Sequence, residues 1–132
     1  MILEPLKSSG MSLIKIVAPL EPVPFPRPAS NGKRRFNPPR YTQFKDALGL
    51  IARRAMGGQA PFSGAVRLRA DFYKLKPRQP TSRNWGDVDN HLKAVLDSLN
   101  GICYEDDRLI VDVRATLNHG DPLIIITIEE AT

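Results

Sequence analysis

The sequence predicts an α+β fold: a single domain with the order β-α-β-α-β-β, in which two helices pack on a small mixed sheet. Two segments with apolar residues at helical spacing stand among segments in which apolar and polar residues alternate. Turns that contain Gly, Asn or Pro separate these segments. The chain has 132 residues, which suffices for one hydrophobic core without disulfides. Residues 1–10 show neither pattern, so we expect a flexible N-terminal extension followed by one domain over residues 11–132.

The N-terminal half should supply a strand, an extended loop and a helix. Residues 12–17 (SLIKIV) are mostly apolar and β-branched, which is typical of strands. Residues 19–41 hold seven of the twelve prolines, and proline lacks the N–H that a helix needs. A helix should then run from a cap at Thr42 to about Met56, where Gly57-Gly58 ends it.

The C-terminal half should supply a strand, a helix and two further strands. Residues 64–75 alternate apolar and charged side chains, which predicts a half-exposed strand. A second basic, Pro-containing loop at residues 76–86 precedes a helix at residues 89–99, whose leucines and valine follow the i, i+3, i+4, i+7 pattern. Residues 109–117 and 123–128 should be strands, and the short turn NHGDP between them predicts a hairpin.

Charge is segregated along a chain whose net charge is +5. Residues 27–83 contain fourteen Lys and Arg against two acidic residues, whereas residues 87–112 contain seven acidic residues against two basic ones. The basic region favours a nucleic-acid partner, although a solvated loop would have a similar composition. Phe25, Phe36 and Tyr41 interleave with its cations and would be available to stack on unpaired or distorted bases. The candidate phosphate contacts are Arg27, Lys33, Arg34, Arg35, Arg40, Lys76, Arg78 and Arg83.

The acidic region contains a possible metal site. Asp87 and Asp89 enter the second helix, and strand alternation is expected to point Asp107 toward the helices and Asp106 away from them. If helix and strand pack, Asp87, Asp89 and Asp107 converge, and each like-charged pair costs about 4 kcal/mol at 4 Å in a medium of dielectric near 20. Mg²⁺, with Mn²⁺ as a possible substitute, would relieve this repulsion and leave coordination positions for water and phosphate. Lys93, one turn after Asp89, would stabilise negative charge in the transition state or position the attacking water.

The same acidic residues also have ordinary structural interpretations. Asp87 or Asp89 could serve as a helix cap, and Asp89 with Lys93 could form a surface pair four residues apart. Asp106 and Asp107 could simply form a turn. These alternatives stay open for each residue taken singly.

The remaining titratable residues of this region suggest no second site. Asp97 is expected to be an exposed helix charge outside the catalytic core, and His91 and His119 should occupy surface or turn positions. The lone Cys103 excludes an internal disulfide framework and fits a reducing, cytoplasmic setting as a small apolar filler. No apolar run reaches the roughly 20 residues of a membrane span, and no signal-peptide pattern opens the chain, so we expect a cytoplasmic protein.

The segment GDVDNHLKAVLDSLNG, followed by YEDDRLIVDVRA, resembles the signature of the RusA-type Holliday-junction endodeoxyribonucleases. The likeness is dense over residues 86–114, whereas the upstream segments are similar only in layout. It implies a RusA-like fold and a homodimeric, Mg²⁺-dependent hydrolase of DNA recombination and repair, which resolves four-way junctions by paired symmetric nicks. The resemblance assigns metal binding and catalysis to Asp87, Asp89 and Asp107, a role in cleavage to Lys93 and a supporting role to Asn90. Asp106, beside Asp107, is a further supporting candidate.

Two other functions fit the same residues. One is a non-enzymatic DNA-binding module, in which the acidic residues hold a structural cation and produce no nicks. The other is a metal-dependent nuclease that acts on flaps or single strands instead of four-way junctions.

Overall fold

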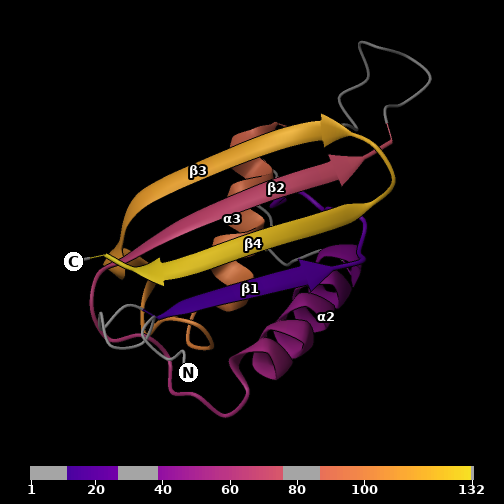
Figure 1. Cartoon of the computed structure of the whole chain (residues 1–132). Coiled ribbons are helices and arrows are strands. Elements are labelled where there is room, and N and C mark those ends of the chain that lie inside the picture. Colours follow the sequence, from indigo (N-terminus) through magenta and orange to yellow (C-terminus); the bar gives the residue numbers. More distant parts are fainter. Residues whose placement is uncertain (1–11, 27–38, 76–86, 132) are drawn as a thin grey trace, which may run out of the picture.

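The computed structural model describes residues 12–26, 39–75 and 87–131. These residues form a four-stranded mixed sheet with two helices on one face, as Figure 1 shows. The elements, in chain order, are β1 (Leu13–Ala18), α2 (Pro39–Met56), β2 (Val66–Lys74), α3 (Val88–Leu99), the short 3-10 helix η2 (Asp107–Leu109), β3 (Ile110–His119) and β4 (Leu123–Glu130). The predicted α+β class and the order β-α-β-α-β-β are confirmed.

The strands lie side by side in the order β1-β4-β2-β3. β2 and β3 are parallel, and β4 is antiparallel to both β1 and β2. The expected hairpin between the last two strands is therefore wrong, because β2 lies between β3 and β4. Burial explains the order: β4 places Ile124, Ile126 and Ile128 in the core, which suits a central strand, whereas most of β3 is partly or fully exposed, which suits an edge.

The core lies between the sheet and the two helices. Alternate residues of β2, from Val66 to Phe72, are buried against side chains such as Leu48 of α2 and Leu99 of α3. α2 begins at Pro39, three residues before the expected cap at Thr42. Proline suits the first helical position, because its missing N–H has no partner there in any helix.

α3 lies between the parallel strands β2 and β3 in the chain, and it runs back along one face of the sheet to connect them. Its N-terminal end lies at the C-terminal end of β2, where Lys74 Nζ is 3.2 Å from His91 Nε2. Its C-terminal end leads through η2 into the first residue of β3, which is in register with the first residue of β2. A helix of 12 residues is about 18 Å long. Residues before α3 and residues after it therefore lie at opposite ends of the sheet.

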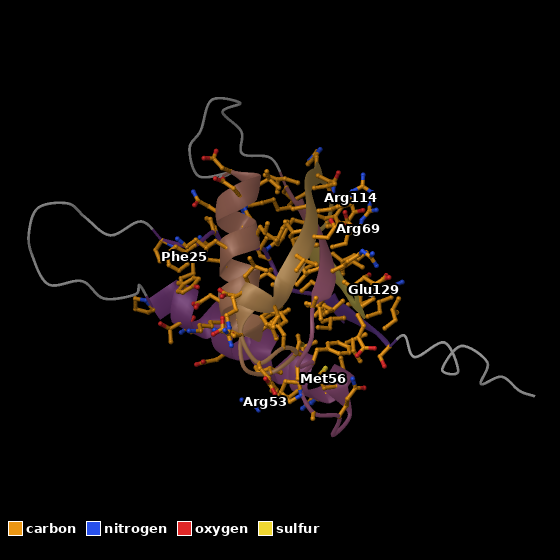
Figure 2. The ribbon with its side chains drawn as sticks, turned by 90° about the vertical axis from the view of Figure 1, so that its left-hand side faces the viewer. Phe25, Arg53, Met56, Arg69, Arg114 and Glu129 are labelled. Atoms are coloured by element: carbon orange, nitrogen blue, oxygen red, sulfur yellow. The ribbon has the colours of Figure 1, made fainter. Side chains whose placement is uncertain are left out.

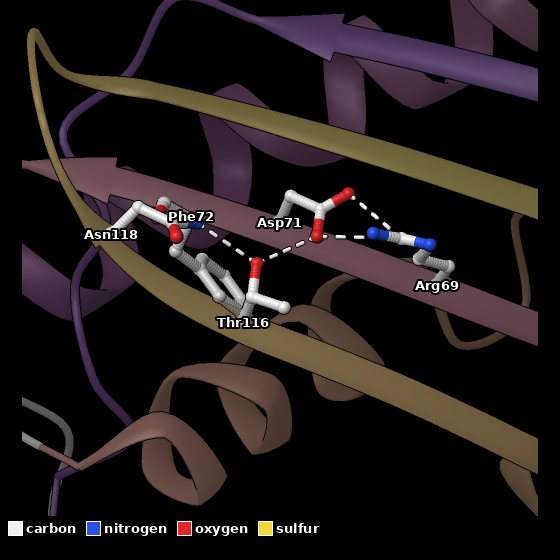
Figure 3. Close-up of polar contacts among 5 residues, drawn as sticks. All are labelled: Arg69, Asp71, Phe72, Thr116 and Asn118. Atoms are coloured by element: carbon white, nitrogen blue, oxygen red, sulfur yellow. Dashed lines mark hydrogen bonds and ion pairs between the residues drawn. The ribbon is translucent and has the colours of Figure 1, made fainter.

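The other face of the sheet carries polar side chains. Figure 2 shows Arg69, Arg114 and Glu129 on the side of the sheet that faces away from the helices. In Figure 3, Asp71 of β2 accepts hydrogen bonds from Arg69 Nε at 3.0 Å and from Thr116 Oγ1 at 2.6 Å. The Thr116 contact ties β2 to β3 on the open face, whereas the Arg69 contact lies within β2. In the described part of the chain, neither helix is long and apolar enough to cross a membrane.

Candidate active site

Asp87 occupies the N-cap position of α3 with an extended backbone, at φ −104° and ψ 150°. Its carbonyl oxygen accepts hydrogen bonds from the backbone N–H groups of Asn90 and His91, each at 3.1 Å. The Asp87 side chain makes no capping hydrogen bond, so the carboxylate is not the group that caps the helix. This geometry holds Asp87 at the start of the helix and leaves its carboxylate exposed to solvent.

His91 is fully buried, which corrects the expectation of a surface or turn position. Its Nδ1 lies 2.8 Å from the Asp87 carbonyl oxygen, and its Nε2 lies 3.2 Å from Nζ of Lys74, which is also buried. These partners fix the tautomer: Nδ1–H donates to the carbonyl, and Nε2 accepts from the ammonium group. Burial lowers the pKa of His91 and, likewise, the pKa of Lys74.

The pattern of β2 contained a signal for this buried pair. Lys74 shares strand parity with Val66, Leu68 and Phe72, which form the buried side of β2. His91 lies one turn before Val95 on the apolar side of α3. Both positions therefore belong to the core by periodicity, although their side chains are polar.

Lys93 and Asp89 are exposed on the first two turns of α3. The described residues contain no Asp89–Lys93 ion pair; instead, Lys93 Nζ lies 4.6 Å from the centroid of the Phe25 ring. The backbone N–H of Phe25 donates to the Asn90 carbonyl at 2.9 Å. The segment before residue 27 thus lies along α3, and its ring gives Lys93 a cation–π contact at the surface.

Phe25 and Tyr41 do not form the exposed base-stacking platform that the sequence suggested. Their rings meet edge to face with centroids 5.5 Å apart, and Tyr41 is 1% exposed. Phe36 lies outside the described residues.

Asp106 and Asp107 are neighbouring carboxylates at η2. The backbone N–H of Arg108 donates to Asp106 at 3.0 Å, which lowers the pKa of Asp106. Desolvation raises the pKa of Asp107, and the neighbouring charges of Asp106 and Asp97 raise it further. Asp107 therefore takes up a proton more readily than Asp106, as expected where like charges crowd.

Asp97 connects α3 to α2 and is only half-buried. Its carboxylate accepts a hydrogen bond from the Tyr41 hydroxyl at 2.7 Å and pairs with Lys45 Nζ at 3.2 Å. Burial and this carboxylate raise the pKa of Tyr41. Asp97 thus has a structural role between the two helices, whereas the sequence led us to expect only an exposed helix charge.

The structure corrects the expectation that Asp87, Asp89 and Asp107 converge within one chain. The two former residues lie at the N-terminal end of α3, and Asp107 lies beyond its C-terminal end. Among the residues that the structure describes, no three or more Asp, Glu, His or Cys side chains lie close enough together to hold one metal ion. The three aspartates of a single chain therefore do not fit one shared Mg²⁺.

Two local features explain why the alternation argument failed for Asp107. Residues 107–109 form a 3-10 turn instead of continuing the strand. The β2–β3 register then shifts, because Val66 pairs with Ile110 and Arg67 pairs with Asp112, which leaves Val111 as an extra residue. Side-chain parity therefore does not extend from β3 back to Asp107.

Of the predicted phosphate contacts, the structure describes Arg40, at the start of α2. Its guanidinium group lies 3.7 Å from the Glu21 carboxylate, and both side chains are well exposed. Seven further predicted contacts lie outside the described residues: Arg27, Lys33, Arg34, Arg35, Lys76, Arg78 and Arg83.

Comparison with known proteins shows similarity to a bacterial protein and to a family model. The Uncharacterized protein YqaN of Bacillus subtilis (strain 168) is 27% identical over 144 residues, which cover 92% of this chain and 99% of YqaN. The family model described as Endodeoxyribonuclease RusA matches residues 19–129, which include both helices and the acidic segment around α3. The chain therefore belongs to the RusA endodeoxyribonuclease family.

Proposed function

We propose that this protein is a structure-selective endodeoxyribonuclease that resolves Holliday junctions, four-way DNA junctions, by paired symmetric nicks. The observation that carries this proposal is the RusA family match over residues 19–129, which spans the DVDN segment at the start of α3 and the Asp pair at η2. Its role would be in DNA recombination and repair. The buried thiol of Cys103 is compatible with a reducing cytoplasm.

The proposed catalytic residues are Asp87, Asp89, Lys93 and Asp107, supported by Asn90 and Asp106. Lys93 presents an ammonium group at the surface beside Asp89, where it can hold a phosphate oxygen of the cleaved strand. Asn90 helps to place Lys93, because its carbonyl fixes the segment that carries Phe25.

The proposed cofactor is Mg²⁺, for which Mn²⁺ could substitute. Carboxylate oxygens are the ligands that these hard cations prefer, and a bound ion would supply activated water and neutralise charge on the phosphate. Within one chain, however, Asp107 lies a helix length away from Asp87 and Asp89, so a single chain holds only part of the ligand set.

The proposed partner is branched DNA, bound by a homodimer. Two equivalent strands must be cut to resolve a junction, and a two-fold axis presents two equivalent sites to them. Arg40 and the predicted cations outside the described residues would contact phosphates. Because each such contact releases a counterion, binding should weaken steeply with salt.

The deciding experiment compares cleavage of a mobile four-way junction, a flap, a plain duplex and a single strand in Mg²⁺. We expect symmetric nicks in the junction, with 5′-phosphate and 3′-hydroxyl ends. Asp89→Asn should abolish nicking and retain junction binding. Asp46→Asn, at an exposed aspartate of α2, is the matched control and should cut normally. Cleavage by Asp89→Asn at the wild-type rate would refute the site assignment, and a preference for flaps or single strands would refute the junction assignment.

A further inference from the structure

In the described structure, Lys93 does not form the ion pair that its position on α3 favours. Asp89 stands four residues before it, and an acid followed by a lysine four residues later is the favourable order for a surface pair on a helix. Both side chains are exposed, yet Lys93 Nζ lies instead over the ring of Phe25, 4.6 Å from its centroid. An aromatic ring thus takes the place that a carboxylate would be expected to take.

Contacts other than Lys93 fix the position of the Phe25 ring. The backbone N–H of Phe25 donates to the Asn90 carbonyl of α3 at 2.9 Å. Its ring meets the edge of the buried Tyr41 ring of α2, with centroids 5.5 Å apart. The Tyr41 hydroxyl in turn donates to Asp97 of α3 at 2.7 Å. Figure 2 shows Phe25 on the helix side of the molecule. The ring is therefore held against both helices, whether or not a ligand is bound.

The sequence around Phe25 favours this placement. The segment from Pro22 to Pro26 has proline at every second position, and the residue before a proline is kept out of the helical conformation. Val23 is 9% exposed and anchors the segment in the core. Because Phe25 is not itself a proline, it keeps the N–H that donates to Asn90. The flanking prolines also reduce the conformational entropy that the segment loses when it is held in place.

A ring and a carboxylate have different effects on a neighbouring ammonium group. A carboxylate would cancel the positive charge of Lys93, whereas the face of a neutral ring attracts the ammonium group and leaves its net charge in place. An ammonium group has three N–H donors, so those that do not point at the ring can donate to phosphate oxygens. The contact with Phe25 therefore holds the lysine in one place and leaves it able to bind an anion.

We propose that Phe25 is a positioning residue for cleavage: its ring holds the Lys93 ammonium group beside Asp89, but not paired with it, where the ammonium can donate to a phosphate oxygen of the cleaved strand. This inference rests on the proposed nuclease function and adds to it a residue outside the acidic motif. Phe25 does not touch the reacting atoms and acts through Lys93.

Two substitutions at Phe25 test this role in cleavage of a four-way junction in Mg²⁺. Phe25→Leu keeps an apolar side chain and removes the aromatic face, whereas Phe25→Tyr keeps the ring. We expect kcat to fall by about two- to fivefold in Phe25→Leu, the fold-change that an exposed cation–π contact supports, and to stay near the wild-type value in Phe25→Tyr. Junction affinity should be unchanged in both, because it comes from many phosphate contacts.

Tyr104→Phe is the structural control. It removes a buried hydroxyl that donates to the Leu96 carbonyl at 2.8 Å, near the end of α3 that lies away from Lys93. The melting temperature should fall, because a buried hydrogen bond is lost, while kcat stays unchanged. All variants are assayed well below their melting temperatures. An equal loss of kcat in Tyr104→Phe and Phe25→Leu would assign the effect to stability alone and overturn the proposal.

Nuclear magnetic resonance tests the contact without relying on cleavage. An aromatic ring shields protons that lie over its face, so the ε-methylene protons of Lys93, assigned with the help of Lys93→Arg, should be shifted upfield. The shift should persist in Phe25→Tyr and disappear in Phe25→Leu.

Three results would overturn the proposal and leave the nuclease function standing. They are unshifted Lys93 signals in the wild-type protein, a kcat of Phe25→Leu equal to or above the wild-type value, and a loss in Phe25→Tyr as large as in Phe25→Leu. A wild-type protein that cuts no DNA would instead refute the proposed function, and with it the role given to Phe25.

Discussion

The buried contact between Lys74 and His91 should stabilise the start of the acidic motif. His91→Phe keeps an aromatic ring against Phe72, whose centroid lies 5.5 Å from that of His91. The change removes the acceptor 3.2 Å from Lys74 Nζ and the donor 2.8 Å from the Asp87 carbonyl. A hydrogen bond to a charged group contributes about 1.5–3 kcal/mol and a neutral one about 0.5–1.5 kcal/mol, so we expect the free energy of unfolding to fall by about 2–4.5 kcal/mol.

Urea denaturation measures this loss directly. With a slope of about 2 kcal/mol/M, in the middle of the usual range for urea, the midpoint should fall by about 1–2 M. The double variant His91→Phe, Lys74→Met is the internal control, because replacing both partners with apolar groups leaves no buried ammonium group beside the new ring. It should be more stable than His91→Phe alone. A single variant that loses less than about 0.5 kcal/mol, or a double variant that is less stable still, would refute the reasoning.

Three further predictions follow from the described contacts. The pKa of His91 is lowered in the folded chain, so on acidification the unfolded chain takes up the proton first. The free energy of unfolding should therefore be constant above the ordinary histidine pKa of 6.5 and decrease as the pH falls below it. Melting the wild-type protein and His91→Phe side by side should show a smaller decrease in the variant. Tyr41→Phe removes the hydroxyl that donates to Asp97 at 2.7 Å and should cost about 1–2 kcal/mol in urea denaturation, whereas an unchanged midpoint would contradict a stabilising α2–α3 contact. Burial raises the pKa of the Cys103 thiol to about 11, so a disulfide reagent should react slowly with the folded protein and fully after denaturation; rapid reaction of the folded protein would contradict this burial.

Local periodicity determined the helices and strands of this protein from its sequence alone. The alternation in β2 and the i, i+3, i+4, i+7 pattern in α3 reflect which side chains face the core, and each pattern lies within one element. The acidic motif is also local, because Asp87, Asp89 and Lys93 occupy one helix start. Since all of these signals are short-range, the residue order alone was enough to predict the fold class and the family.

Only the tertiary structure decided how distant segments meet. The insertion of β4 between β1 and β2 depends on burying Ile124, Ile126 and Ile128 in the sheet centre, which is a competition among strands and not a property of one. Because β2 and β3 are parallel, α3 must run in the opposite direction to both strands to connect them. Asp107 therefore lies at the far end of the helix from Asp89. Sequence spacing reports distance along the chain. The separation of these carboxylates in space depends instead on strand direction, which is set by long-range packing of the whole sheet.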